Sequence, residues 1–437
     1  MCYELEIHPR DVLYFRDGRP LGGSNDGSGA MWPQPSIFHS AMLGALHGSL
    51  GSSIGQWESN HHVTEKEAAK KSKVRFQFGG LKTWGPFPKK NDKIFVPTPA
   101  DLLPAEENLS DGVAVPLKLP TPSDLQSANC ATNLPVPLKY PVGSFNQPSK
   151  ATLGGWISMD ELYRYLEGKV KGLQTVDSKE FYSEESRPGI GIDSETGVTQ
   201  EHMFYSAEYL RLTEGTSMAA FAECFAKKYD GTETDVLKEL FQSTSQTPFI
   251  FGGQRGMAYL ECCRDKRNFP EPDVSSTCIK WVLLTPAYFE HGWIPSWVNM
   301  EHNENFDPGI EQGRVMLKEK VERGAMMRDE WRRKIAIVTP VGANLVAARI
   351  PKPVAVSGWK LDKDADCAGG EAKPTRLYVP AGAVYYFKCD SSEGAKKLVA
   401  LLHGQTKSDR LGEQGFGLGI CGTWNFKSLT NDGGVNE

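Results

Sequence analysis

Glycine clusters that carry an arginine are the parts of this sequence best suited to binding chemistry. Residues 249–256 read Phe-Ile-Phe-Gly-Gly-Gln-Arg-Gly and place Arg255 in a predicted tight turn. Such a turn suits a phosphate or a base edge, because the guanidinium can donate two parallel hydrogen bonds to one acceptor group. A hairpin bend with a solvated arginine explains the same residues, so both interpretations stay open.

A second glycine cluster, Gly-Phe-Gly-Leu-Gly-Ile-Cys-Gly, occupies residues 415–422 and follows Lys407 and Arg410. Glycines at this density let one backbone approach another closely, and their N–H groups can face phosphates. The cluster lacks the Gly-Lys-Ser/Thr ending of a nucleotide-binding P-loop and the spacing of a dinucleotide-binding turn. The alternative is a glycine-rich strand end packed beneath a helix.

Two further segments have residues suited to RNA. In the run Tyr-Phe-Arg-Asp-Gly-Arg-Pro at 14–20, Arg16 and Arg19 flank an Asp17-Gly18 turn. Aromatic stacking combined with arginine contacts is a common way to hold single-stranded RNA, although a local Arg–Asp network explains the run equally well. Residues 187–212 predict a projecting hairpin, which would either separate bases or pack on a neighbouring subunit.

Catalytic constellations are poor. His39 and His47 share a predicted helix, but no second acid or lysine lies at a fixed spacing from them. His61 and His62 have no cysteine or acidic ligand at zinc spacing. We therefore expect no enzyme activity, no metal and no cofactor. The alternative is an endoribonuclease that uses His39 or His47 as its general base.

The bulk composition is that of a globular protein of two or three domains. The chain has 437 residues, of which 39% are hydrophobic, and a net charge of −5. Basic residues nevertheless gather between Lys70 and Lys93, where a local patch would suffice for phosphate binding. Nine cysteines without CxxC spacing fit a reducing cytoplasm. We expect no membrane span, because no apolar run reaches about 18 residues, and no signal peptide at the charged N-terminus.

Strands alternate with single helices in both halves, which predicts an α+β fold. The first half combines a strand at 2–15, a helix from about 36, a proline-rich surface insertion at about 99–150, and a helix opened by a capping box at Ser158. A polar stretch at 264–276 predicts a domain boundary. We therefore expect two domains, residues 1–263 and 277–437, each an open α+β sandwich with a glycine-rich segment. No repeat is detectable between the two halves of the sequence.

The motifs together resemble the family of Cmr subunit three, RAMP proteins of type III-B CRISPR (Cmr) effector complexes. The resemblance is carried by residues 9–20, the helix from Pro35 to Leu46, 185–191, 249–255, 356–359, 373–386 and 415–419, dispersed over nearly the full length and in the family's order. It implies two tandem ferredoxin-like (RRM-like) domains with glycine-rich loops, long insertions and a thumb β-hairpin at about 187–212.

The resemblance also implies a non-catalytic, cytoplasmic subunit that grips the 5′ tag of the crRNA. Its partners would be the large polymerase-like Cmr subunit and the backbone and tag-proximal RAMP subunits, with the target RNA nearby and no membrane. The implied RNA contacts lie on the first loop, the first helix, the thumb and both glycine-rich segments: Arg16, Asp17, Gly18, Arg19, Ser36, His39, Arg187, Tyr205, Gly252, Gly253, Gln254, Arg255, Gly256, Arg410, Gly415, Phe416, Gly417 and Gly419. A protein-only assembly subunit is a further alternative.

Two segments depart from the family's pattern. Gln254 and Gly256 stand where a glutamate and a basic residue are usual, and His47 replaces an arginine at the end of the first helix. Both departures reduce local positive charge, so Arg255 is expected to carry more of the phosphate contact.

Overall fold

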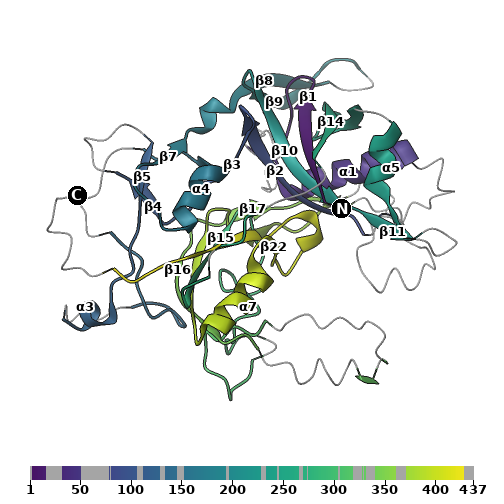
Figure 1. Cartoon of the computed structure of the whole chain (residues 1–437). Helices are drawn as coiled ribbons and strands as arrows, with labels where there is room; N and C mark the ends of the chain where they lie inside the picture. The colour runs from purple at the N-terminus through teal and green to yellow at the C-terminus, as the bar shows by residue number, and fades with distance from the viewer. Residues whose placement is uncertain are drawn as a thin grey trace.

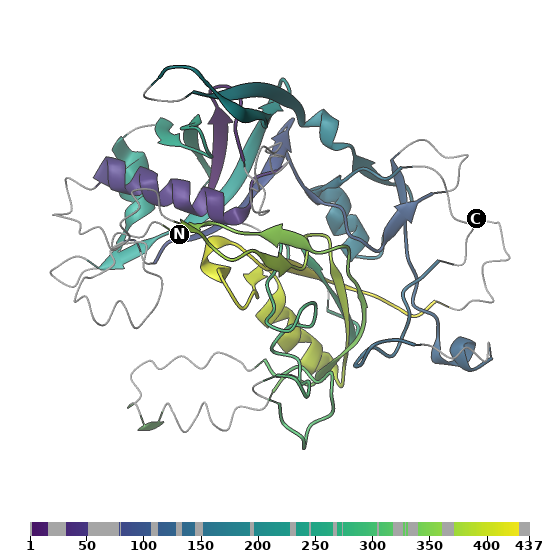
Figure 2. The same cartoon turned by 180° about the vertical axis from the view of Figure 1, so that it is seen from behind.

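The protein forms two halves, each built on an antiparallel sheet (Figures 1 and 2). The computed structural model describes residues 2–15, 32–50, 78, 80–105, 112–127, 133–144, 152–192, 196–227, 233–243, 246–264, 269–272, 274–303, 306–317, 327, 329–330, 340–360 and 371–427. Within these residues, no helix is long and apolar enough to cross a membrane.

The N-terminal half contains a ten-stranded sheet. Its strands lie in the order β13 (Gln246–Ile250), β14 (Met257–Arg264), β1 (Tyr3–Pro9), β10 (Thr216–Glu223), β2 (Lys82–Lys90), β3 (Lys93–Pro97), β6 (Trp156–Ser158), β7 (Leu173–Val176), β5 (Val113–Pro116) and β4 (Leu102–Pro104). Both edge strands contain a proline, Pro248 in β13 and Pro104 in β4.

Alternation along β1 decides which face of this sheet is covered. Leu5 and Ile7 are fully buried against helices α1 (Pro35–Leu50) and α5 (Val236–Ser243), where they join Phe38 and Leu237 in one core. The intervening side chains of β1 point to the opposite face, because successive residues of a strand alternate. Figure 2 shows α1 lying across the sheet.

The C-terminal half contains a five-stranded sheet, ordered β16 (Ala343–Arg349), β21 (Val384–Cys389), β15 (Cys278–Leu283), β23 (Leu418–Thr423) and β22 (Gln405–Thr406). Helix α7 (Ser392–Leu402) packs on it through Ala395, Leu398 and Leu402. It begins where the Ser391 side chain accepts a hydrogen bond from the Gly394 backbone N–H.

Four two-stranded ribbons, two short α-helices and two 3-10 turns (Ser178–Glu180 and Gly412–Gln414) complete the part of the chain that the structure describes. The ribbons are β8 (Tyr182–Ile192) with β9 (Thr199–Leu212), β11 (Phe225–Lys227) with β12 (Glu233–Asp235), β17 (Val354–Val356) with β20 (Arg376–Tyr378), and β18 (Trp359–Lys360) with β19 (Glu371–Ala372). The β8–β9 ribbon confirms the predicted hairpin. Helix α4 (Met159–Leu166) confirms the predicted helix and its serine N-cap, since Ser158 Oγ accepts from the Glu161 N–H at 3.3 Å, while the Glu161 carboxylate accepts from Arg164 and the Gln174 N–H. Helix α3 (Pro122–Ser127) has no buried residue.

The proline-rich segment 99–150 is not wholly the surface insertion that the sequence predicts. Its first part forms β4 and β5, and Leu102, Ala114 and Leu119 are buried. The prediction was wrong here because these strands are only three and four residues long and end at prolines, so they show no clear period.

One hydrophobic core joins the two halves. It combines Trp84, Phe87 and Tyr165 of the first half with Tyr386 and Trp424 of the second. The far side of the N-terminal sheet is thus apolar where the C-terminal half covers it.

A buried carboxylate lies in this shared core. Asp101 is 2% exposed, and its Oδ2 accepts hydrogen bonds from Tyr165 Oη at 2.6 Å and Tyr386 Oη at 2.5 Å. Close by, Lys280 Nζ lies 3.3 Å from the centre of the Tyr165 ring and donates to the Tyr165 carbonyl at 3.1 Å. Because a buried charge is costly unless it is hydrogen-bonded, this group requires both halves to be docked.

The Asp101 contacts predict unequal costs for two neighbouring tyrosines. Tyr386→Phe removes a hydrogen bond to a buried carboxylate and should lower the free energy of unfolding by about 2 kcal/mol in urea titrations. The matched control is Tyr385→Phe, which removes a hydrogen bond to the neutral Trp293 carbonyl and should cost about 1 kcal/mol. A Tyr385 variant that is the less stable of the two would contradict the role given to Asp101.

Lys280 predicts a pH dependence of stability. Burial lowers its pKa from 10.5 to about 8. Between these values the unfolded chain binds a proton that the folded chain lacks, so stability from this group rises with pH, by at most about 1.4 kcal/mol per pH unit. Lys280→Met lacks this contribution. The free energy of unfolding of the variant minus that of the wild type should therefore fall from pH 7.5 to pH 10 in parallel urea titrations. A difference that stays constant would refute the assignment.

Candidate nucleic-acid interface

Three segments that the sequence singles out meet at one end of the N-terminal sheet. Residues 13–15, which follow β1, run between the β8–β9 ribbon and the turn that joins β13 to β14. Leu13 and Leu210 exchange backbone hydrogen bonds of 2.9 and 2.8 Å, and the Gly253 N–H donates to the Tyr14 carbonyl at 2.8 Å. The Tyr14 ring packs on Tyr209 of β9, with centroids 5.4 Å apart.

The glycines of the turn are needed for contact within the protein. Gly252 has φ +86°, and a Cβ on Gly253 would lie 2.8 Å from the Tyr14 ring. The side of these glycines on which a Cβ would stand therefore faces residues 14–15 and not a nucleotide strand. Gly253 itself is exposed, and next to it the turn presents its two central side chains to solvent.

Those side chains, Gln254 and Arg255, sit on a strained backbone. Both have positive φ, 55° and 54°, within a turn closed by a 3.1 Å hydrogen bond from the Gly256 N–H to the Gly253 carbonyl. This is the pattern of a type I′ turn, which favours asparagine and glycine. Arg255 is exposed, and among the described residues none forms a hydrogen bond or ion pair with it. It is therefore a cation on a fixed backbone turn, without a counter-charge among the residues that the structure describes.

Two other arginines at this end, Arg187 and Arg211, are already paired with carboxylates. Arg187 Nε donates to Glu185 at 2.7 Å and lies over the Tyr209 ring at 4.9 Å. Arg211 donates to Glu185 at 2.8 Å and to Asp11 at 3.1 Å. Hydrogen bonds from Arg187 and Arg211 lower the pKa of Glu185. Arg187 would have to exchange a carboxylate for a phosphate before it could bind RNA.

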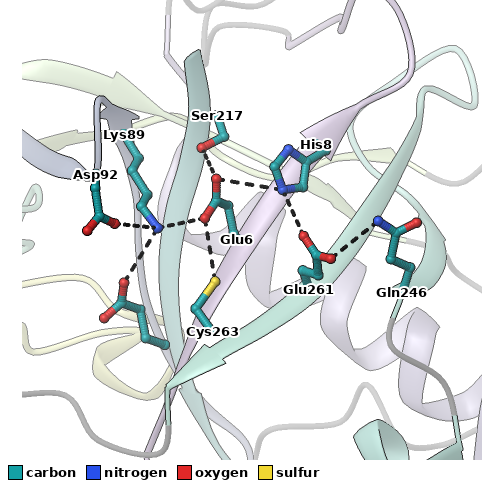
Figure 3. Close-up of polar contacts among 9 residues, drawn as sticks. Glu6, His8, Lys89, Asp92, Ser217, Gln246, Glu261 and Cys263 are labelled. Carbon is teal, nitrogen blue, oxygen red and sulfur yellow. Dashed lines mark hydrogen bonds and ion pairs between the residues drawn. The ribbon is translucent and has the colours of Figure 1, made fainter. Parts of the chain in front are cut away.

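The open face of the same sheet is rich in carboxylates (Figure 3). The Glu6 carboxylate contacts Lys89 Nζ at 2.6 Å, and His8 lies 3.3 Å from Glu261. Burial alone would raise the pKa of Glu6 and lower that of Lys89, but their mutual contact outweighs it and shifts both toward the charged form. Glu4 adds a third carboxylate 3.9 Å from Lys89. This face does not favour phosphate, so the candidate interface is confined to the end of the sheet.

The first helix offers less to RNA than predicted. His39 is 5% exposed, its Nδ1 lies 3.1 Å from Thr83 Oγ1, and burial lowers its pKa to about 4. It is therefore a buried neutral residue. Ser36, at the start of α1, is half-buried. Arg16, Asp17, Gly18 and Arg19 lie outside the described residues, as does the side chain of Tyr205, whose backbone pairs with Gly189.

The glycine cluster near the C-terminus is interior. Gly415, Phe416, Gly417 and Gly419 are all buried, and the cluster leads into β23. A Cβ on Gly415 would lie 2.6 Å from the Thr83 carbonyl, and one on Gly422 would lie 2.7 Å from the Leu166 carbonyl. These glycines allow the two halves to approach closely. The prediction that this segment forms a loop facing phosphates is therefore wrong. Of the RNA contacts expected in this segment, Arg410 alone is exposed, and it lies ahead of the cluster.

Sequence reasoning missed the aromatic pair and the carboxylates at this end. Tyr14 and Tyr209 each fall within a segment of interest, but they are almost 200 residues apart, so no local pattern links them. Among the described residues, no group of three His, Cys, Asp or Glu side chains is arranged to hold a metal ion.

The strained turn predicts a stabilising substitution. Gln254→Gly should raise the free energy of unfolding by about 1 kcal/mol, because an L side chain in the left-handed region costs about 1–2 kcal/mol. Gln174→Gly is the matched control: Gln174 is exposed in the extended strand β7, where glycine should cost about 0.5–1 kcal/mol. Urea denaturation of both variants measures the effects, and a destabilised Gln254→Gly would show that the turn is not strained.

The chain is similar to known CRISPR-associated proteins. A family model described as CRISPR-associated protein (Cas_Cmr3) matches residues 5–424. No curated protein matches. Similar solved structures include a chain of a type III-B Cmr-beta complex bound to cognate target RNA, at 13% identity over 94% of this chain and 95% of that one, with a TM-score of 0.43.

Another is a chain of that complex bound to cognate target RNA and AMPPnP, at 14% identity over 88% of this chain and 86% of that one, with a TM-score of 0.40. A chain of a Csm3–Csm4 subcomplex from the type III-A CRISPR-Cas interference complex is 11% identical over 97% of this chain and 99% of that one, with a TM-score of 0.34. The family match spans both halves, and on that ground the chain belongs to the Cmr3 family of CRISPR-associated proteins.

Proposed function

We propose that this chain is a non-catalytic crRNA-binding subunit of a type III-B Cmr effector complex. The observation that carries the proposal is Arg255, exposed on a strained turn that is fixed to the Tyr14 backbone and has no described counter-charge. The turn fixes the backbone from which the guanidinium projects, and the planar fork can donate two parallel hydrogen bonds to one phosphate. Membership of the Cmr3 family supports the proposal.

We infer that both halves are ferredoxin-like domains. In the first, β1, α1, β2, β10, α5 and β14 follow one another along the chain and the strands lie in the order β14-β1-β10-β2. This is the β-α-β-β-α-β arrangement of that fold. In the second, β15, β16, β21, α7 and β23 give the order β16-β21-β15-β23. Here Ile294, Val298 and Met300, from the segment between β15 and β16, pack in the core on this sheet.

The finer assignments extend this proposal. The turn at 252–256, together with the loop at 16–19, would grip the 5′ tag of the crRNA in the cytoplasm. The β8–β9 ribbon would act as the thumb near the target RNA, supported by the exposure of Ile190, Ile192 and Val198 at its tip. The chain would link the large polymerase-like subunit to the backbone and tag-proximal RAMP subunits.

The absence of catalysis is part of the proposal and is supported by the surroundings of the two candidate histidines. His39 is buried and, with a pKa of about 4, is a weak base at neutral pH. His47 packs edge-on against Phe78, with ring centroids 4.8 Å apart. A general base needs to reach the proton that it removes, and neither environment favours this.

The proposal predicts that one side chain of the turn controls RNA affinity. Arg255→Gln should weaken binding roughly ten- to hundredfold, because it removes a charge-assisted hydrogen bond. The slope of log affinity against log salt should fall by about 0.7 for each phosphate of a single strand that is no longer neutralised. The probe is fluorescein-labelled RNA with the sequence of the RNA that co-purifies with the tagged protein, followed by fluorescence anisotropy.

Lys396→Gln is the control, because it also removes one exposed positive charge but lies on α7, outside the turn. It should bind RNA as the wild type does. Equal affinity of the wild type and Arg255→Gln would count against the proposal, and failure to recover any RNA with the assembled complex would favour a protein-only assembly subunit. Incubating repeat RNA in EDTA tests the endoribonuclease alternative, where cleavage that disappears in His39→Ala or His47→Ala would overturn the non-catalytic assignment.

A further inference from the structure

The candidate interface of the N-terminal half has a structural counterpart in the C-terminal half. In the first half, the segment after β1 pairs with β9 through Leu13 and Leu210. In the second half, the segment after β15 pairs with Val379, the residue after β20, through Ala287, with backbone hydrogen bonds of 2.9 and 2.8 Å in both directions. The two ribbons also occur at the same point along the chain of each half. The β8–β9 ribbon lies between the second and third strands of the first ferredoxin-like fold, β2 and β10, and β17–β20 lies between those of the second, β16 and β21.

The aromatic pair is repeated at the same register. Tyr14 follows Leu13 and packs on Tyr209, while Tyr288 follows Ala287 and packs on Tyr378 with centroids 5.3 Å apart. The segment that precedes the last strand is repeated as well. The Asp409 N–H donates to the Tyr288 carbonyl at 2.9 Å, as the Gly253 N–H does to the Tyr14 carbonyl. Arg410 follows Asp409 and, like Arg255, is exposed.

The arginines beside the aromatic pair have different partners in the two halves. Arg376 Nη1 donates to Tyr288 Oη at 2.9 Å, and its guanidinium lies 5.3 Å from the centre of the Tyr288 ring. The Arg410 guanidinium lies 5.6 Å from the same ring. Among the described residues, no carboxylate pairs with either arginine. This contrasts with Arg187, which Glu185 engages.

The carboxylate next to Arg410 in the sequence is bonded to other groups and not to either arginine. The Asp409 carboxylate accepts hydrogen bonds from Ser296 Oγ and from the Glu290 N–H, which occupy both of its oxygens. Burial raises the pKa of Tyr378, and the positive charges of Arg376 and Arg410 act in the opposite direction, so both lie near its hydroxyl. Two like charges held beside one tyrosine repel each other until an anion lies between them or next to them.

We propose that Arg376 and Arg410, held by Tyr288, form a second binding site for the phosphates of an RNA strand. The site rests on the proposed RNA-binding function, and it joins Arg410, an expected RNA contact, to Arg376 and Tyr288, which the sequence did not single out as contacts. Its ligand is the phosphodiester backbone and not a stacked base, because Tyr288 and Tyr378 are only 8% and 3% exposed. One RNA molecule bound by both halves would then be held at two equivalent places.

The test measures the anisotropy of the same labelled crRNA with the full-length chain over a series of salt concentrations. Arg376→Gln/Arg410→Gln should weaken binding roughly tenfold or more, and the salt slope should fall by about 0.7 for each phosphate that the variant no longer neutralises. Tyr288→Phe keeps the ring and removes only the hydroxyl that positions Arg376, so it should weaken binding less, with the fold intact. Lys396→Gln, an exposed lysine on α7, is the matched control for removing one charge and should bind as the wild type does.

The outcomes separate this site from the function on which it rests. If Arg255→Gln binds more weakly while the double variant and Tyr288→Phe bind as the wild type does, the second site is refuted and the first stands. If neither arginine site affects binding, both proposals fail. An equally weakened Lys396→Gln would show a general charge effect and refute the site. A double variant that binds RNA normally but no longer joins the complex would reassign the two arginines to a protein contact.

Discussion

The shared core between the two halves is the constraint on which both candidate binding sites depend. The buried Asp101 carboxylate has its hydrogen bonds only while a tyrosine from each half donates to it. Gly415 and Gly422 complete this contact, because only a residue without a Cβ lets their backbone lie against Thr83 and Leu166. The halves are therefore locked in one relative position, and that position fixes the separation between Arg255 and the Arg376–Arg410 pair.

Although the chain as a whole carries a net negative charge, some of the cations that the structure describes are paired with carboxylates and others are not. Glu6 and Lys89 satisfy each other on the open sheet face, and Glu185 engages Arg187 at the base of the thumb. Arg255, Arg376 and Arg410 have no such partner among the described residues. Each pair removes a cation from the set available to a phosphate, whether the pair is largely buried, as Glu6–Lys89 is, or exposed, as Glu185–Arg187 is. Counting basic residues is thus a poor guide to where RNA binds.

The sequence predicted the α+β class, the β8–β9 hairpin and the helix N-cap at Ser158, because each follows from local spacing. It also placed Arg255 in an exposed turn. It could not predict that the Gly415 cluster is interior, since density of glycine is the same whether the close neighbour is a phosphate or the Thr83 carbonyl. Nor could it link Tyr14 to Tyr209 or reveal that Tyr288 and Tyr378 repeat that pair, because the two halves share a backbone arrangement and not a residue pattern.

The prolines at the two edges of the ten-stranded sheet bear on how the molecule can join others. Pro248 and Pro104 have no N–H, and in antiparallel register each stands at an outward-facing position, as the inward hydrogen bonds of Phe251 and Ala105 indicate. A foreign strand approaching either border would find a missing donor, which disfavours continuation of the sheet into another chain. At these two borders, contacts with other chains should therefore be made by side chains and loops, and the same two residues disfavour aggregation through these edges.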